Sequence, residues 1–157
     1  MKRKEKLISV LNTILIGKLT SINQLMAHSE MCENLGYSKL QADIQKLASD
    51  QMLLVESLIE RISFLDGSGT LSELSSVMIA KTVSDLMDKN NNKDALLIHN
   101  NAMDLAQEAG DHTTADLLSQ ILKMEETHTD WTAIQRDQIA QKGLDMYLIT
   151  QTESILN

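Results

Sequence analysis

The sequence predicts an all-α fold, in which four long helices form a bundle and a short fifth helix follows at the C-terminal end. The 157 residues include no proline and are rich in leucine, isoleucine, methionine, alanine and glutamine, which favour helix. One of the six glycines, Gly17, falls inside the first apolar helical stretch. The other five fall at expected helix ends: Gly36, Gly67, Gly69, Gly110 and Gly143. The length fits a single domain over residues 1–157, large enough to bury a core without disulfides.

The first helix is expected over residues 5–34 and carries one charged residue on its inner side. Apolar side chains recur at spacings of three and four, as on the buried face of an amphipathic helix. The inner positions are Leu7, Leu11, Ile14, Lys18, Ser21, Leu25 and His28. The ammonium group of Lys18 must therefore reach solvent along its own stem or find a partner inside the bundle.

The second helix is expected over residues 38–65, with Ser38 as its N-cap. Its inner positions are Leu40, Ile44, Leu47, Gln51, Leu54, Leu58, Ile62 and Leu65. Met52 falls one position away from this inner face. The residues that share its side of the helix are Gln45, Ser49, Glu56 and Ile59. This side is expected to point out of the bundle, toward a neighbouring molecule.

A long crossover and three further helices are expected in the rest of the chain. Residues 66–80 are long enough to cross the bundle from end to end, so that the second and third helices run parallel. The remaining helices are expected over residues 81–109, 112–137 and 144–156. Three asparagines at 90–92 predict a frayed or bulged turn inside the third helix. The fourth helix directs Glu125 and His128 inward, and the fifth is so short that it must pack on the bundle.

Composition argues against several classes of partner. Fourteen basic and twenty-two acidic residues give a formal net charge of −8, which does not fit a nucleic-acid-binding surface. The single cysteine, Cys32, rules out an intrachain disulfide and fits a reducing compartment. The basic residues 2–4 precede an apolar run without a convincing cleavage site, and no stretch approaches the ~18 apolar residues of a membrane span. We therefore expect a cytoplasmic protein with no nucleic-acid or membrane partner.

Several blocks of sequence resemble the bacterioferritins, and the resemblance covers the whole chain. The blocks are Ile22-Asn23-Gln24, His28, Met52, Ile59-Glu60-Arg61-Ile62-x-Phe64-Leu65-x-Gly67, Glu125-Glu126-x-His128-x-Asp130-Trp131 and Gly143-Leu144-x-x-Tyr147-Leu148. The resemblance implies a ferritin-like four-helix bundle in a hollow shell of twenty-four subunits that stores ferric mineral. It also implies a di-iron ferroxidase centre in each bundle, haem b held between two subunits by one methionine from each, and a ferredoxin-type reductant as partner.

Most of the di-iron ligands that the resemblance implies are replaced in this chain. Glu125 and His128 match two of them, and a carboxylate and an imidazole three residues apart on a helix can bind one cation. The other matching positions hold Lys18, Gln51, Leu54 and Asn92. Two closely spaced metal ions need several anionic oxygens, so we expect Glu125 and His128 to be a remnant without ferroxidase activity. We also expect a buried ion pair between Lys18 and Glu125.

The haem ligand that the resemblance implies is retained as Met52. Its thioether is a suitable ligand for haem iron, and a two-fold axis would supply a second one. The expected lining residues are Leu19, Ile22, Asn23 and Met26 of the first helix and Gln45 and Ser49 of the second. On spacing alone, an ordinary interface methionine is the better interpretation of Met52, and the resemblance to the family is what favours haem ligation.

The sequence thus predicts a haem-binding iron-storage subunit that co-assembles with a second, ferroxidase-active subunit. Two alternatives stay open. In one, Glu125 and His128 bind a metal that supports ferroxidase activity. In the other, the chain is a purely structural shell subunit with neither haem nor metal.

Overall fold

The computed structural model describes residues 2–65, 82–89 and 93–152. Its helices are α1 (Lys2–Asn34), α2 (Ser38–Phe64), α3 (Val83–Lys89), α4 (Lys93–Glu108), α5 (His112–Lys142) and α6 (Leu144–Thr150). These ranges contain no strand, and none of their helices is both long and apolar enough to cross a membrane. The predicted helical bundle with a short C-terminal helix is confirmed.

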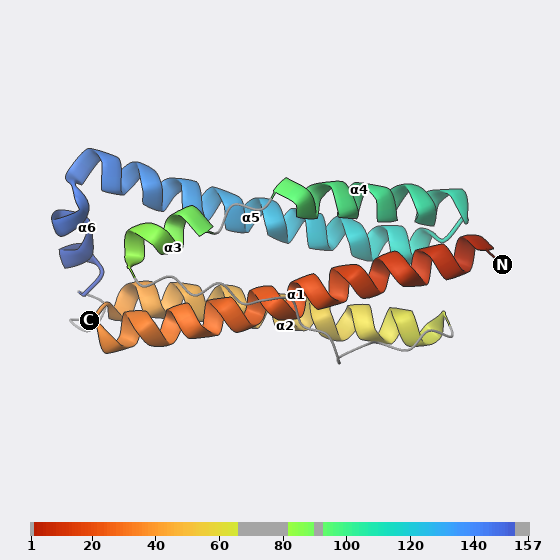
Figure 1. Cartoon of the computed structure of the whole chain (residues 1–157), viewed down its shortest axis with the longest axis horizontal. Coiled ribbons are helices and arrows are strands. Elements are labelled where there is room, and N and C mark those ends of the chain that lie inside the picture. The colour runs from red at the N-terminus through yellow and green to blue at the C-terminus, as the bar shows by residue number, and fades with distance from the viewer. Residues whose placement is uncertain (1, 66–81, 90–92, 153–157) are drawn as a thin grey trace.

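The long helices lie side by side, with α1 and α2 antiparallel and α4 and α5 antiparallel (Figure 1). The helices α2 and α4 both run toward the end of the bundle where the chain begins, which confirms the predicted parallel orientation. The residues of the predicted crossover, 66–80, lie outside the described part of the chain. At the opposite end, α6 turns across the bundle after Gly143, whose φ of 80° ends α5.

Helix lengths differ from those expected in three places. The third helix, expected over 81–109, is represented by two separate helices, α3 and α4, and the asparagines at 90–92 lie outside the described residues. Helix α5 continues past residue 137 to Lys142, because no helix-breaking residue occurs before Gly143. Helix α6 ends at Thr150, and the expected continuation over 153–156 is not among the described residues.

The hydrophobic core consists of two clusters along the bundle axis. One includes Leu11, Leu15, Leu58, Ile62 and Leu118 at the end where α1 begins. The other includes Leu25, Cys32, Leu40, Ile44 and Tyr147 at the end that α6 covers. Between the two clusters, each of three helices contributes one buried polar side chain: Lys18, Gln51 and His128. This interruption of the apolar core is the polar centre described below.

Helix α6 packs on the bundle through the buried Tyr147 and the half-buried Leu148. Tyr147 is fully buried among the second cluster, and its hydroxyl donates a hydrogen bond to Gln135 Oε1 at 2.7 Å. Burial raises the pKa of Tyr147 well above its usual value. The backbone N–H of Lys39 donates to the carbonyl oxygen of Gln151 at 2.8 Å, just beyond α6. These contacts confirm that the fifth helix is stabilised by packing.

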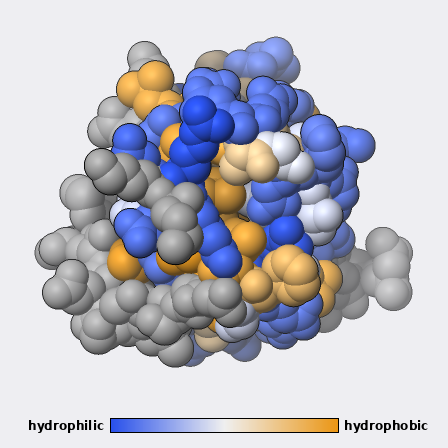
Figure 2. Space-filling view, turned by 90° about the vertical axis from the view of Figure 1, so that its right-hand side faces the viewer, coloured by the Kyte–Doolittle hydropathy of each residue, from blue (hydrophilic) through white to orange (hydrophobic). Residues whose placement is uncertain are grey.

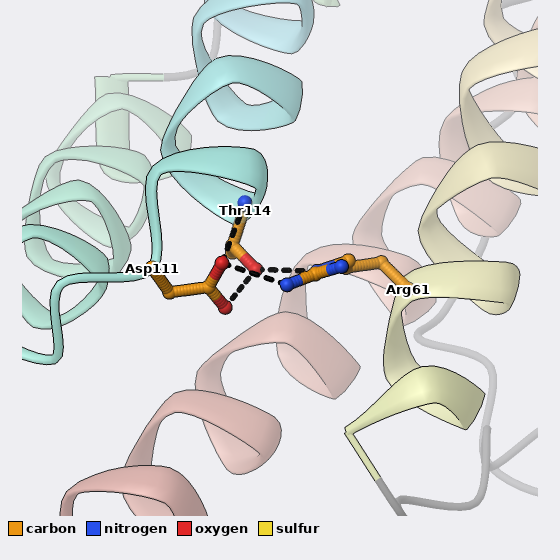
Figure 3. A network of polar contacts seen from close by, with 3 residues as sticks. All are labelled: Arg61, Asp111 and Thr114. Atoms are coloured by element: carbon orange, nitrogen blue, oxygen red, sulfur yellow. Dashed lines mark hydrogen bonds and ion pairs between the residues drawn. The ribbon is translucent and has the colours of Figure 1, made fainter.

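At the other end, a polar network joins α2 to the start of α5 (Figure 3). Arg61 donates to Asp111 Oδ1 at 2.7 Å and to Thr114 Oγ1 at 2.8 Å, and Asp111 also caps α5 by accepting from the Thr114 N–H at 3.0 Å. Burial alone would raise the pKa of Asp111, but the hydrogen bonds from Thr114 and the charge of Arg61 outweigh it and lower the pKa. Seen from this end, the described residues present mostly hydrophilic side chains with hydrophobic ones between them (Figure 2).

Candidate functional site

The polar centre contains the ion pair that the sequence predicts. The ammonium group of Lys18, on α1, contacts the carboxylate of Glu125, on α5, across the bundle. The Lys18 side chain is 6% exposed, so the ammonium end of the pair is buried. The Glu125 side chain is 34% exposed, so the carboxylate end is in contact with solvent. Leu54, at another position where the family resemblance implies a metal ligand, is buried and belongs to the first hydrophobic cluster.

Gln51 and His128 form the second polar contact of the centre. Gln51 Nε2 lies 3.2 Å from His128 Nδ1, so the amide donates to the ring and leaves the ring proton on Nε2. Gln51 Oε1 and His128 Nε2 are buried and have no hydrogen-bond partner within the described residues. The sequence placed both side chains inward but did not predict that they would pair.

Electrostatics keep the polar centre neutral overall near pH 7. Burial lowers the pKa of Lys18 to about 8, so its ammonium form still predominates and balances the carboxylate of Glu125. Burial, with a smaller contribution from the charge of Lys18, lowers the pKa of His128 to about 4, so its imidazole is uncharged. A metal ion at this place would meet one ammonium group and one already paired carboxylate.

Over the ranges that the structure describes, no group of three or more histidine, cysteine, aspartate or glutamate side chains could hold a metal ion. Glu125 and His128 lie in the same centre, but Gln51 and Leu54 complete it with an amide and an aliphatic side chain. Asn92, the fourth replaced position, lies outside the described residues. The donor set therefore does not fit the pair of metal ions that several carboxylates would stabilise.

The outer face of α2 presents Met52 to the surroundings of the chain. Met52 is 41% exposed, and Ser49 and Gln45, one and two turns before it, are exposed as well. A hydrogen bond of 2.8 Å from Gln41 Nε2 to Gln45 Oε1 holds Gln45 along the helix. This arrangement agrees with the sideways face predicted from helical spacing.

Residues of α1 extend this face at matching levels. The hydroxyl of Ser29 donates to the carbonyl oxygen of Gln41 at 3.2 Å, which sets the register of the two antiparallel helices. Both helices rise equally per residue, so Leu19, ten positions before Ser29, lies near the level of Gln51, the residue before Met52. Leu19 is half-buried.

The remaining predicted haem-lining residues of α1 divide between surface and core. Asn23 is exposed and Met26 is 59% exposed, as expected. Ile22 differs from the expectation, because it is only 3% exposed and packs in the first hydrophobic cluster. A ligand on this face of the single chain would therefore contact Leu19, Asn23 and Met26 rather than Ile22.

Comparison with known proteins finds similarity over nearly the whole chain. The ferritin-like domain family matches residues 8–141. A bacterial ferritin from Synechocystis sp. is 32% identical over 154 residues, which cover 96% of this chain and 99% of that protein. Bacterioferritins from Mycolicibacterium paratuberculosis and Mycobacterium avium are each 30% identical over 154 residues, covering 94% of both chains.

Proposed function

The chain belongs to the bacterioferritin family of ferritin-like proteins, and on this premise we propose that it is an iron-storage shell subunit that binds haem through Met52 but lacks a ferroxidase centre of its own. The observation that carries the proposal is the buried ion pair between Lys18 and Glu125. It stands at the positions where the family resemblance calls for two carboxylate ligands. Oxidation of iron within this bundle is therefore the step that we expect to be missing.

Loading the polar centre with metal would require breaking this ion pair. Removing a charged partner from a buried pair typically costs ~3–5 kcal/mol, because the other charge stays without compensation. Lys18 is almost completely buried, so its ammonium cannot simply move into solvent. The remaining donors, the amide of Gln51 and the imidazole of His128, carry no negative charge to repay that cost.

The outer face of α1 and α2 supports the haem part of the proposal. Met52 presents a thioether that the single chain leaves 41% exposed, with the apolar side chain of Met26 and the half-buried Leu19 on the neighbouring helix. A second copy of this surface across a two-fold axis would supply the second thioether and cover the apolar faces of the macrocycle. Bound haem would supply electron transfer during iron release.

Co-assembly with a second, ferroxidase-active bacterioferritin subunit follows from the missing ligands. A shell made only of this chain would hold mineral but load it slowly. In a mixed shell the partner would oxidise iron, and this chain would contribute Met52 and its haem. We expect shells of twenty-four subunits, as the family resemblance implies, with a reductant of ferredoxin type acting at the haem.

Native mass spectrometry of the shell from its source tests composition and haem content together. We expect two kinds of subunit and one haem per pair of subunits that supply Met52. A visible spectrum of the recombinant protein should show a Soret band that Met52→Leu abolishes, while Met146→Leu, a matched change on α6, preserves it. Absence of the band from the unmodified protein would exclude haem binding and favour a purely structural subunit.

Iron oxidation tests the other half of the proposal. Anaerobic addition of Fe(II) to the homomer, followed by oxygen or peroxide, should give oxidation no faster than that of the buffer. Rapid oxidation that His128→Leu removes would instead establish a working metal site at Glu125 and His128. That result would overturn the proposed division of labour.

A further inference from the structure

The outer face of α2 that carries Met52 also carries one negatively charged side chain, Glu56. Glu56 follows Met52 by four positions, so the two side chains are neighbours on the helix surface, with Cβ atoms ~5–6 Å apart. Both are exposed in the single chain. The other residues that share this side, Gln45, Ser49 and Ile59, carry no charge. A molecule bound at Met52 therefore lies within one helical turn of a carboxylate.

The cations of the two helices do not compensate this carboxylate. Lys18, Lys46 and Arg61 form ion pairs with other carboxylates. Within the part of the chain that the structure describes, no ion pair engages Glu56. The residues that extend the face on α1 are uncharged, namely Leu19, Asn23 and Met26. The negative charge of Glu56 is therefore the dominant charge on this face.

A fixed negative charge beside haem favours ferric over ferrous iron, because the ferric form carries one more positive charge. In open solvent, salt would screen this effect within a Debye length of ~8 Å. A second copy covering the face would exclude water from it and add its own Glu56 across the two-fold axis. At an effective dielectric constant of ~20, two unit charges ~10 Å apart interact strongly enough to shift an equilibrium by about tenfold or more.

We propose that Glu56 sets the reduction potential of the haem site and holds it below the value that the two Met52 thioethers alone would give. This inference rests on the proposed haem site. Thioether ligation raises the potential of haem iron, and the carboxylates of Glu56 offset that rise. One electron enters the site from the proposed reductant and leaves to ferric iron of the mineral. A lower potential makes the second transfer more favourable, so Glu56 promotes iron release.

Spectroelectrochemical titration of the assembled, haem-loaded protein tests this role at one fixed pH and ionic strength. Glu56→Gln should favour the ferrous form at least tenfold, which raises the midpoint potential by at least 59 mV for one electron. Glu56→Asp keeps the charge and should stay within threefold of the unmodified protein. Glu33→Gln is the matched control, since it removes an exposed carboxylate of α1 that lies fourteen positions, or ~21 Å, beyond Leu19. It should change the equilibrium less than twofold.

The possible outcomes separate this inference from the haem proposal. A Soret band in the unmodified protein together with an unchanged midpoint in Glu56→Gln would overturn the role of Glu56 alone. Absence of the band from the unmodified protein would overturn both. If Glu56→Gln takes up no haem, Ser49→Asp provides the second test, because it adds a carboxylate one turn before Met52. Its midpoint should fall by at least 59 mV, and an unshifted midpoint would overturn the inference.

Discussion

Replacing Lys18 by methionine should destabilise the protein in a way that depends on pH. Methionine keeps an unbranched side chain in the buried position but removes the charge opposite Glu125, which is left with an unpaired carboxylate. The carboxylate can escape by taking up a proton. At pH 7 that costs ~3.7 kcal/mol for an ordinary glutamate pKa of ~4.3, which sets an upper limit on the effect. Because the Glu125 side chain is 34% exposed, partial hydration should reduce the loss to about 2–3 kcal/mol.

Removing the other charge of the pair, by Glu125→Gln, should lower the free energy of unfolding by more than Lys18→Met does. Lys18 is then left as the unpaired charge, and its side chain is only 6% exposed. Losing its proton at pH 7 costs up to ~4.8 kcal/mol from the ordinary lysine pKa of 10.5. The double variant removes both charges and should be more stable than the sum of the single effects predicts, by about 2 kcal/mol or more.

Thermal melting followed by circular dichroism, at fixed protein concentration, measures these effects. A loss of 2–3 kcal/mol corresponds to a fall in Tm of roughly 4–12 °C for a chain of this size. In Lys18→Met the unpaired Glu125 has a raised folded pKa, so its penalty is present at neutral pH and fades as the pH falls toward its unfolded pKa of ~4.3. The difference from the unmodified protein should therefore shrink between pH 7 and pH 5. An unchanged Tm at pH 7, or equal differences at both pH values, would refute the ion-pair reasoning.

Three further predictions concern other contacts of the fold. The pKa of His128 is about 4 in the folded protein and 6.5 in the unfolded chain. The free energy of unfolding should therefore fall by up to ~3 kcal/mol as the pH drops from 6.5 to 4. In thermal melts over the same pH range, the His128→Gln variant should lose less stability. Tyr147→Phe leaves Gln135 Oε1 without its donor and should lower Tm by roughly 2–8 °C, whereas Tyr37→Phe, a matched change at a half-buried tyrosine, should have little effect. Arg61→Met should lower the free energy of unfolding by ~1–3 kcal/mol in the same assay, because it removes both hydrogen bonds that join α2 to the start of α5. An unchanged Tm would show that this network is dispensable.

Helical spacing predicted much of the fold because apolar residues recur at intervals of three and four along the long helices. It placed Lys18 and Glu125 on inner faces, and the ion pair followed from their opposite charges. The case of Ile22 shows where the method fails. Helix α1 packs against both α2 and α4, so its buried surface is wider than one stripe and includes Leu15 and Ile22.

Helical spacing could not predict side-chain contacts between residues that are far apart in the sequence. Arg61 and Asp111 are separated by fifty positions, and only the packing of α2 against α5 brings them together. A possible signal for the Asp111 cap was present in the sequence, as an aspartate three residues before Thr114 at a helix start. The end of α5 at Lys142 was also recoverable, since Gly143 is the first helix-breaking residue after Gly110.

The side chains at the positions that match metal ligands form a mutually consistent set. Lys18 balances the charge of Glu125, and Gln51 Nε2 donates a hydrogen bond to His128 Nδ1, whereas a carboxylate at that position could only accept one from an Nδ1–H. Leu54 joins the adjacent hydrophobic cluster instead of adding a second imidazole. Random loss of a metal site would be expected to leave unpaired carboxylates, whose mutual repulsion destabilises the bundle. The observed combination instead makes a layer of compensated charge between the two clusters, as expected if the proposed loss of the ferroxidase centre is correct.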